Sequence, residues 1–390
     1  MVPVKTKLFL LSYFLLGFGL ILYGLNRYNG WDLDTYFAVA DAAAQGKQIY
    51  GEKHLTLYPP PGGYCLELLR YFPRKAVHVV WFFISILLVL RIVWMGLQLF
   101  PAPQTSSTKL AFYFWLSVWA ALQGVGAQIE SGNINLLLMY FLMEGMTRLE
   151  GLKNRWGWGL VLLWLPVLFK PYLGLIAFGL TLSVWKKKGW KVFSIPAFVI
   201  LTALFISLLT KGLSRVSFDF KNWLSGDVEH IHRAFTLSAN AVNFGIPSYF
   251  YHIFGWPLSA VSGLTLFFSL LGLLYSLYEK NQLKLFCLLS MLTFCISPAS
   301  FSYSMLLLWF PILYFTKETL WDEAPILQSW KKMAGVLFLF ALIFLNPTFT
   351  GRAFFNDIIV PHRITTWFVV LGLLSLGRLD WDKREFDPPC

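Results

Sequence analysis

Apolar segments recur so regularly along this chain of 390 residues that they exclude most soluble folds. They lie at 8–25, 77–100, 110–126, 134–147, 157–169, 171–185, 192–210, 256–277, 283–297, 303–316, 333–346 and 364–377. Only 13% of the residues are charged, against roughly 25% in soluble domains. Because a helix of about 20 apolar residues crosses a bilayer, we expect an all-α polytopic membrane protein. It should be a bundle of about 10–12 transmembrane helices, with the shorter segments as half-length passes.

The basic residues predict how the chain is threaded through the membrane. The segments expected to be cytoplasmic hold more than half of the 32 Lys and Arg residues, although they are shorter in total than the outer segments. This bias follows the positive-inside rule and predicts that both termini lie in the cytoplasm. We expect the protein to reside in the plasma membrane. The net charge of +12 is thereby explained without a nucleic-acid partner.

We expect one integral membrane domain over 1–390, with two larger extracytoplasmic loops. The first loop is 26–76, the second is 211–255, and 378–390 is a cytoplasmic tail. Within the first loop, 38–46 is predicted to be a short helix ending at Gly46, and 64–72 repeats apolar residues at helical spacing. The apolar run 8–25 is followed by a polar stop rather than a small-residue cleavage site, so we expect it to be a retained helix.

Lys170 and Pro171 divide the apolar region 157–185 near its centre. A lysine at the middle of a bilayer costs on the order of 3 kcal/mol, and a proline breaks the helical hydrogen-bond ladder. Two half-length helices that meet at Lys170 and Pro171 satisfy both constraints, and their shared tip should face a polar cavity. Counting two passes here also keeps the run that begins at Lys186 in the cytoplasm.

The first outer loop carries the residues that most suggest chemistry. Asp32 and Asp34 follow the first apolar segment, within Gly-Trp-Asp-Leu-Asp-Thr-Tyr at 30–36. Downstream come Gly-Lys-Gln-Ile-Tyr at 46–50 and Tyr-Pro-Pro-Pro at 58–61. Either aspartate could instead cap the helix that follows.

These motifs resemble the first outer loop of glycosyltransferase family 87, whose members are mainly mannosyltransferases of the GT-C fold that use polyprenyl phosphate sugars. Three further stretches follow in the family's order. Ser-Gly-Asn-Ile-Asn-Leu at 131–136 is similar to its Gly-Gln-x-Asn-Leu, Lys-Pro-Tyr at 170–172 to its Lys-Pro, and Ser-Pro-Ala-Ser-Phe at 297–301 to its Ser-Pro-x-Ser-Trp. The resemblance covers roughly residues 30–305. The chain departs from the pattern at 302–304, where the family often has histidine, at Asn133, where it has Gln, and at 240–242, where it often has Asn-Gln-Ser.

The resemblance implies an inverting transfer of a hexose, mannose by analogy with the family, from a polyprenyl phosphate carrier to a glycolipid or glycan hydroxyl on the outer face. Asp32 matches the family's general base, and Asp34 is the second candidate. A carboxylate can act as the general base by taking the proton of the attacking hydroxyl. The phosphate leaving group needs cationic donors, for which Lys170 is the first candidate, with Arg233, His362 and Arg363 from the outer loops.

Other polar residues are candidates for substrate binding, each with a structural alternative. Lys170 could be a lysine that snorkels at a helix end, while Arg233, His362 and Arg363 could be solvated or interfacial. Asn133 and Asn135 open an apolar segment, so Asn133 could be a cap, and Gln128 lies just before them. The aromatic candidates could instead be packed in the loop (Tyr36, Tyr58) or belong to an interfacial belt (Tyr303).

Other chemistries find little support. No Cys or His spacing is typical of a structural metal, no His-Glu-x-x-His and no Walker A motif are present, and we expect neither a metal nor another cofactor. A transporter or lipid flippase is the main alternative, because broken helices are also typical of transporters. An envelope scaffold with a degenerate site is the third.

Overall fold

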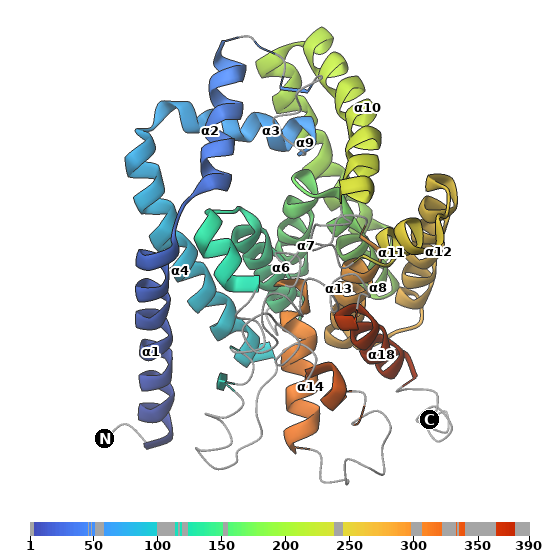
Figure 1. Ribbon diagram of the computed structural model, residues 1–390. Coiled ribbons are helices and arrows are strands. Elements are labelled where there is room, and N and C mark those ends of the chain that lie inside the picture. Colours follow the sequence, from blue (N-terminus) through green and yellow to red (C-terminus); the bar gives the residue numbers. More distant parts are fainter. Residues whose placement is uncertain are drawn as a thin grey trace. The chain divides into compact units, whose positions relative to one another are not determined.

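The protein is an all-α polytopic membrane protein. The computed structural model describes residues 4–45, 47, 49–50, 58–99, 114–115, 118, 124–150, 155–237, 245–297, 306–321, 333, 335–339 and 364–378, and every regular element within these ranges is a helix (Figure 1). Three helices of the described part are long and apolar enough to cross a bilayer: Arg74–Leu99, Trp190–Lys211 and Ser259–Ser276. Each coincides with a segment that the sequence predicts to span. Four further apolar helices are shorter.

The internal contacts divide the chain into two compact units, which we describe separately. One comprises Leu10–Met95 and Val125–Ala234 and contains most of the predicted site residues. The other comprises Met1–Phe9, Gly96–Gly124 and Phe235–Cys390. The prediction of a single domain remains a prediction.

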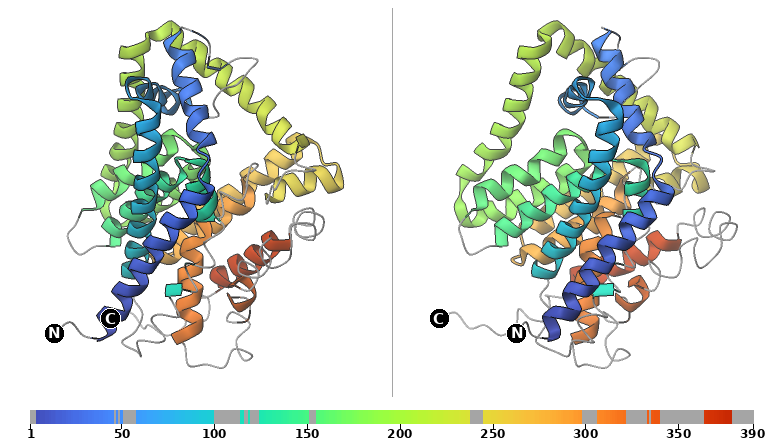
Figure 2. Two further views of the ribbon diagram at one scale, coloured as in Figure 1. Left: turned by 60° about the vertical axis from the view of Figure 1, so that its left-hand side comes forward. Right: turned by 90° about the vertical axis from the view of Figure 1, so that its left-hand side faces the viewer.

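In the first unit, α1 (Val4–Arg27) packs against α4 (Arg74–Leu99). The Tyr13 hydroxyl donates a hydrogen bond of 2.7 Å to the carbonyl of Leu90, and Gly24 leaves room for the ring of Phe82, which a β-carbon there would overlap. Figure 2 shows the two helices beside one another from two sides.

The first predicted outer loop is largely helical. It contains α2 (Trp31–Ala44), α3 (Pro60–Leu66) and the 3₁₀ helix η1 (Glu67–Tyr71). The predicted helix 38–46 is wrong at its start, because α2 already begins at Trp31. Gly30 adopts φ 64° and turns the chain there, and acidic residues in a first helical turn are favoured by the helix dipole. Asp32 and Asp34 therefore lie within the helix rather than before it.

Two short helical arms meet at Lys170 and Pro171, as the sequence predicts. The first arm is α7 (Trp156–Trp164) with η2 (Leu165–Leu168), and the second is η3 (Pro171–Leu173) with α8 (Gly174–Lys188). α6 (Asn135–Glu150) packs closely on α7, since a β-carbon on Gly145 would lie 2.9 Å from the carbonyl oxygen of Gly159. η4 (Trp190–Phe193) and α9 (Ser194–Lys211) form a full-length span, and α10 (Leu213–Leu237) follows in the second predicted outer loop.

The second unit is organised around α13 (Gln282–Ile296), whose residues are buried along the whole helix. Helices α12 (Leu258–Ser276), α14 (Trp309–Trp321) and α18 (Ile364–Arg378) pack against it, and α11 (Ile246–Phe254) contacts α12 and α13. At the start of α13, Asn281 caps the helix by accepting a hydrogen bond from the amide of Lys284.

Candidate active site

The first turn of α2 is anchored to the chain around Glu130. The amides of Asn29 and Gly30 donate hydrogen bonds of 2.9 and 3.1 Å to the carbonyl oxygen of Glu130. The first amide of α2, at Trp31, donates a hydrogen bond of 3.2 Å to Asn29 Oδ1, and neither Asp32 nor Asp34 serves as the capping residue. Both carboxylates are therefore available for other partners.

Asp32 meets the second predicted motif directly. The side-chain amide of Asn133 donates a hydrogen bond of 2.7 Å to the Asp32 carboxylate. The oxygen of the same amide accepts a bond of 2.9 Å from the backbone N–H of Asn135, at the start of α6. The oxygen of Asn133 thus serves the helix start while its nitrogen faces Asp32, and its role in substrate binding stays a prediction. Asp32 is partly exposed.

Asn135 and Gln128 form a buried amide pair beneath this contact. The Asn135 side chain donates a hydrogen bond of 2.9 Å to Gln128 Oε1. Gln128 is fully buried, and its Nε2 has no hydrogen-bond partner among the described residues. Gly132, at φ 70°, makes the tight turn that brings these side chains together.

Tyr36 and Tyr58 line the buried side of the same region. Their hydroxyl groups are hydrogen bonded at 2.8 Å, and the amide of Ile134 donates to the Tyr36 hydroxyl at 3.3 Å. Burial raises the pKa of Tyr36 well above its ordinary value, and the negative charge of Asp32 raises it further. Both rings are buried, so they support the site from within rather than offering an open stacking face.

Lys170 reaches this region from the tip of the two short arms. The ring of Phe169 lies edge-on to that of Tyr58 at 5.9 Å, and Lys170 Nζ lies 5.8 Å from the centre of the Tyr172 ring. Burial of the ammonium lowers the pKa of Lys170 to about 8, and the charge of Asp32 partly opposes this shift. The carboxylate of the first loop and the cation of the tip therefore interact electrostatically, although the sequence separates them widely.

Asp34 has a partner that the sequence analysis missed. Its Oδ1 lies 3.1 Å from Nε2 of His78, in the first turns of α4. His78 Nδ1 in turn lies 3.0 Å from the hydroxyl of Tyr28. A lone histidine near the start of an apolar helix gives no signal in the sequence, since its contacts depend on how α4 lies against α2.

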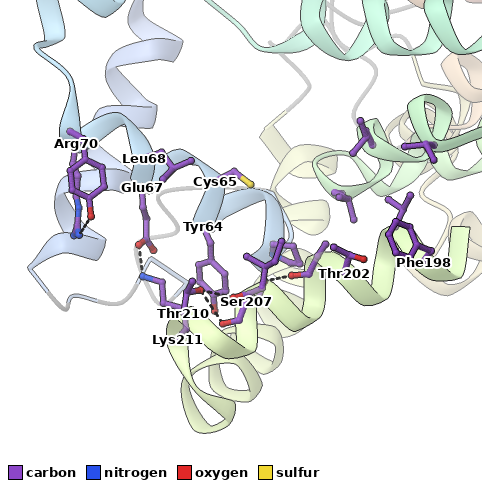
Figure 3. A pocket seen from close by; sticks show the side chains of 18 residues that line it. Tyr64, Cys65, Glu67, Leu68, Arg70, Phe198, Thr202, Ser207, Thr210 and Lys211 are labelled. Atoms are coloured by element: carbon purple, nitrogen blue, oxygen red, sulfur yellow. Dashed lines mark hydrogen bonds and ion pairs between the residues drawn. The ribbon is translucent and has the colours of Figure 1, made fainter. Parts of the chain in front are cut away.

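A largely apolar pocket of about 620 Å³ lies beside α3. Its walls come from α3, η1, the arm α7–η2 and the span α9. Figure 3 shows Arg70, Glu67 and Lys211 gathered at one end, with Phe198 at the other. Leu168, two positions before Lys170, lines the same pocket. The backbone at Leu168 approaches α3 closely, because a β-carbon on Gly62 would lie 2.6 Å from its carbonyl oxygen.

An ion pair and a hydrogen bond join the two predicted outer loops beside this pocket. Lys211 pairs with Glu67 across the loops, while Arg215 pairs at 2.8 Å with the fully buried Asp219 within α10. The same carboxylate oxygen of Asp219 accepts a hydrogen bond of 2.8 Å from the Tyr64 hydroxyl. These contacts hold α9 and α10 against α3 and η1.

Four of the predicted residues cannot be located with the others. Tyr303, His362 and Arg363 lie outside the described residues, and for Arg233 only the backbone, within α10, is described. Among the described residues, no group of three or more His, Cys, Asp or Glu side chains is arranged to hold a metal ion.

Comparisons with known proteins gave one match. The family model described as Glycosyltransferase family 87 matches residues 56–298. This range includes Asn133 and Lys170, whereas Asp32 precedes it. Neither a curated protein nor a solved structure matches the chain.

Proposed function

This chain belongs to glycosyltransferase family 87, and we propose that it moves a hexose, specifically mannose, from a polyprenyl phosphate carrier to a glycolipid or glycan hydroxyl at the outer face of the plasma membrane. The observation that carries the proposal is the partly exposed Asp32 carboxylate, which the Asn133 amide holds at 2.7 Å and whose charge also acts on the half-buried Lys170. A transfer from a sugar phosphate to a hydroxyl requires both a base and a cation. The transporter alternative is not favoured, because the family is one of glycosyltransferases.

Asp32 is the proposed general base. An acceptor hydroxyl has a pKa far above 7, so a carboxylate within hydrogen-bond reach must take its proton as the oxygen attacks. The oxygen forms a bond to the anomeric carbon while the bond from that carbon to the phosphate oxygen breaks. The polyprenyl phosphate leaves with the electron pair, and this single displacement inverts the anomeric centre. Asn133 holds the carboxylate in position through its bond of 2.7 Å.

Asp34 is the weaker candidate for the base. Its carboxylate already accepts a hydrogen bond from, or forms an ion pair with, His78 at 3.1 Å. Asp32 instead accepts a hydrogen bond from the Asn133 amide, which fixes the orientation of the carboxylate. The Asp32 residue remains partly exposed. A single carboxylate base suits an inverting displacement, whereas a retaining reaction needs a second carboxylate as the nucleophile.

Lys170 is the proposed partner of the donor phosphate. In a partly desolvated setting an ammonium interacts strongly with an anion. A bound phosphate would therefore favour the protonated, charged form of Lys170, which burial disfavours. Arg233, His362 and Arg363 remain proposed additional phosphate ligands. In this proposal cations of the chain, rather than a metal ion, neutralise the leaving group.

The apolar pocket supports a donor with a long hydrocarbon chain. Its lining follows α9 from Phe198 to Lys211, a distance of roughly 20 Å at 1.5 Å per residue. α9 is itself long and apolar enough to span the bilayer. A chain that lies along it would remain in a hydrocarbon environment, and Leu168 in the pocket wall lies only two positions before Lys170.

The test is a transfer assay with purified protein, polyprenyl phosphate mannose and a membrane glycolipid extract. We expect the wild-type protein to form a mannosylated product and Asp32→Asn to lose that activity. Asp41→Asn is the matched control, since Asp41 lies on the same helix in an exposed ion pair with Arg74. Equal transfer by wild type and Asp32→Asn would contradict the assignment of the base, and no consumption of the donor by wild type would contradict the function.

A further inference from the structure

His78 links the two chain segments that flank the turn before Asp32. Tyr28 lies just before this turn and Asp34 lies in the first turn of α2, and the two imidazole nitrogens of His78 contact one residue each, at 3.0 and 3.1 Å. The His78 side chain retains 21% of its exposure, against 57% for Asp34. The His78 side chain therefore lies in the contact of α4 with α2, whereas the Asp34 side chain remains largely exposed.

The donors and acceptors of this cluster are complementary. A neutral imidazole with its proton on Nε2 donates to the Asp34 carboxylate and accepts at Nδ1 from the Tyr28 hydroxyl. The ring of Phe37, one turn along α2, stacks on the imidazole with 6.1 Å between centres and 24° between planes. Tyr28, just after the end of α1, and two residues of α2 thus determine the position and orientation of one histidine from α4.

The imidazole also lies directly over the turn itself. A β-carbon on Gly30 would lie 2.6 Å from His78 Nδ1, so the ring occupies the space that any larger residue would need. On another side of the turn, Asn29 and Gly30 donate to the carbonyl oxygen of Glu130. The turn that leads to Asp32 is therefore held by a backbone carbonyl and by the histidine.

We propose that His78, through Asp34 and Tyr28, is a positioning residue that holds the first turn of α2 so that the Asp32 carboxylate meets the acceptor hydroxyl. This inference rests on the proposed function, in which Asp32 is the base. A displacement of about 1 Å in a reacting group can lower a rate by about 10²-fold. One hydrogen bond to Asn133 orients the carboxylate of Asp32 but does not fix the backbone that carries it.

Two substitutions separate the hydrogen bonds of His78 from its packing. His78→Phe keeps an aromatic ring against Phe37 and removes both hydrogen bonds of the imidazole, leaving the Tyr28 hydroxyl only its 3.5 Å contact with the backbone carbonyl of residue 78. In His78→Gln the side-chain nitrogen can donate to Asp34 and the oxygen can accept from Tyr28. We expect His78→Phe to lower kcat by about 10²-fold with an unchanged KM for polyprenyl phosphate mannose, and His78→Gln to retain most of the activity. A raised KM with unchanged kcat, or equal losses in both variants, would overturn the proposal.

Hydrogen–deuterium exchange tests the same proposal without turnover. The peptide over 29–34 contains the amides of Asn29, Gly30 and Asp34, which are hydrogen bonded in the turn. We expect these amides to exchange faster in His78→Phe and at the wild-type rate in His78→Gln. Unchanged exchange in His78→Phe would overturn the positioning role even if sugar transfer is observed. If the wild-type protein transfers no sugar, the proposed function fails, whereas the exchange experiment still decides whether His78 holds the turn.

Discussion

Asp32 and Asn133 show how much of the site depends on a single side-chain pair. Both residues can be identified from the sequence, each from its own motif. The hydrogen bond of 2.7 Å between them cannot, because that bond requires the turn at Gly132 and the contacts of Glu130 with Asn29 and Gly30. Long-range contacts of this kind follow from tertiary packing, which the local pattern of residues does not encode.

Removal of the Asn133 amide should lower the rate of sugar transfer more than it lowers the stability of the fold. A hydrogen bond to a charged group contributes about 1.5–3 kcal/mol, so we expect Asn133→Ala to lower kcat by about 10–100-fold. Asn281→Ala is a matched control, because Asn281 also accepts a backbone amide at a helix start but lies in the other unit. Both variants should lose about 1 kcal/mol of stability, measured by thermal unfolding in detergent. An equal loss of transfer in the two variants would contradict the role of Asn133.

The lowered pKa of Lys170 predicts how transfer activity depends on pH. Its pKa is lowered to about 8, so the ammonium is present below that pH and is lost above it. Since kcat/KM reports the free enzyme, we expect kcat/KM for the donor to fall as the pH rises through about 8. Lys170→Arg keeps its charge at every accessible pH, so its profile should lack this alkaline limb. The same limb in the arginine variant would show that another group titrates.

At the scale of elements, the two arms that meet at Lys170 were predictable and the start of α2 was not. Proline and a charged residue inside an apolar run mark a break in any sequence. The start of α2 depends instead on the positive φ of Gly30 and on two acidic residues in the first turn, which are equally typical of a loop. The prediction therefore began the helix too late, and Asp32 and Asp34 were assigned to a polar segment.

The contact of α3 with the tip depends on Gly62. A β-carbon there would lie 2.6 Å from the carbonyl oxygen of Leu168, and a backbone atom cannot move aside as a flexible side chain can. We expect Gly62→Ala to cost about 1–3 kcal/mol of stability and to reduce transfer, because the clash displaces the chain that leads to Lys170. Gly263→Ala in α12 is the control, since nothing lies within 4 Å of its added carbon. An unchanged melting temperature in Gly62→Ala would contradict this close packing.

At the scale of the whole molecule, composition and the spacing of apolar segments were sufficient to predict a helical membrane protein. The direction in which each span crosses the bilayer rests on the distribution of Lys and Arg and remains a prediction. For α9 it places the end near Lys187 inside the cell and the end near Ser214 outside. Both residues are exposed, so each can be replaced by a cysteine and labelled.

Labelling of single cysteines tests this orientation. In a protein whose Cys65 and Cys390 are replaced by serine, we expect a membrane-impermeant maleimide to label Ser214→Cys in intact cells. Lys187→Cys should react only after the membrane is permeabilised. The buried Cys287 and Cys295 should remain unlabelled in both cases. The reverse order of labelling would invert the topology and place the Asp32 region on the cytoplasmic side.

The most direct measurement of the central claim replaces the acceptor hydroxyl by azide, a nucleophile that has no proton to lose. If Asp32 acts only as the base, Asp32→Ala should bind the donor, fail to transfer its sugar to hydroxyl acceptors, and form the inverted glycosyl azide when azide is added. Asp41→Ala should transfer the sugar to hydroxyl acceptors as the wild type does. If Asp32→Ala binds polyprenyl phosphate mannose but releases no glycosyl azide, Asp32 is not the general base.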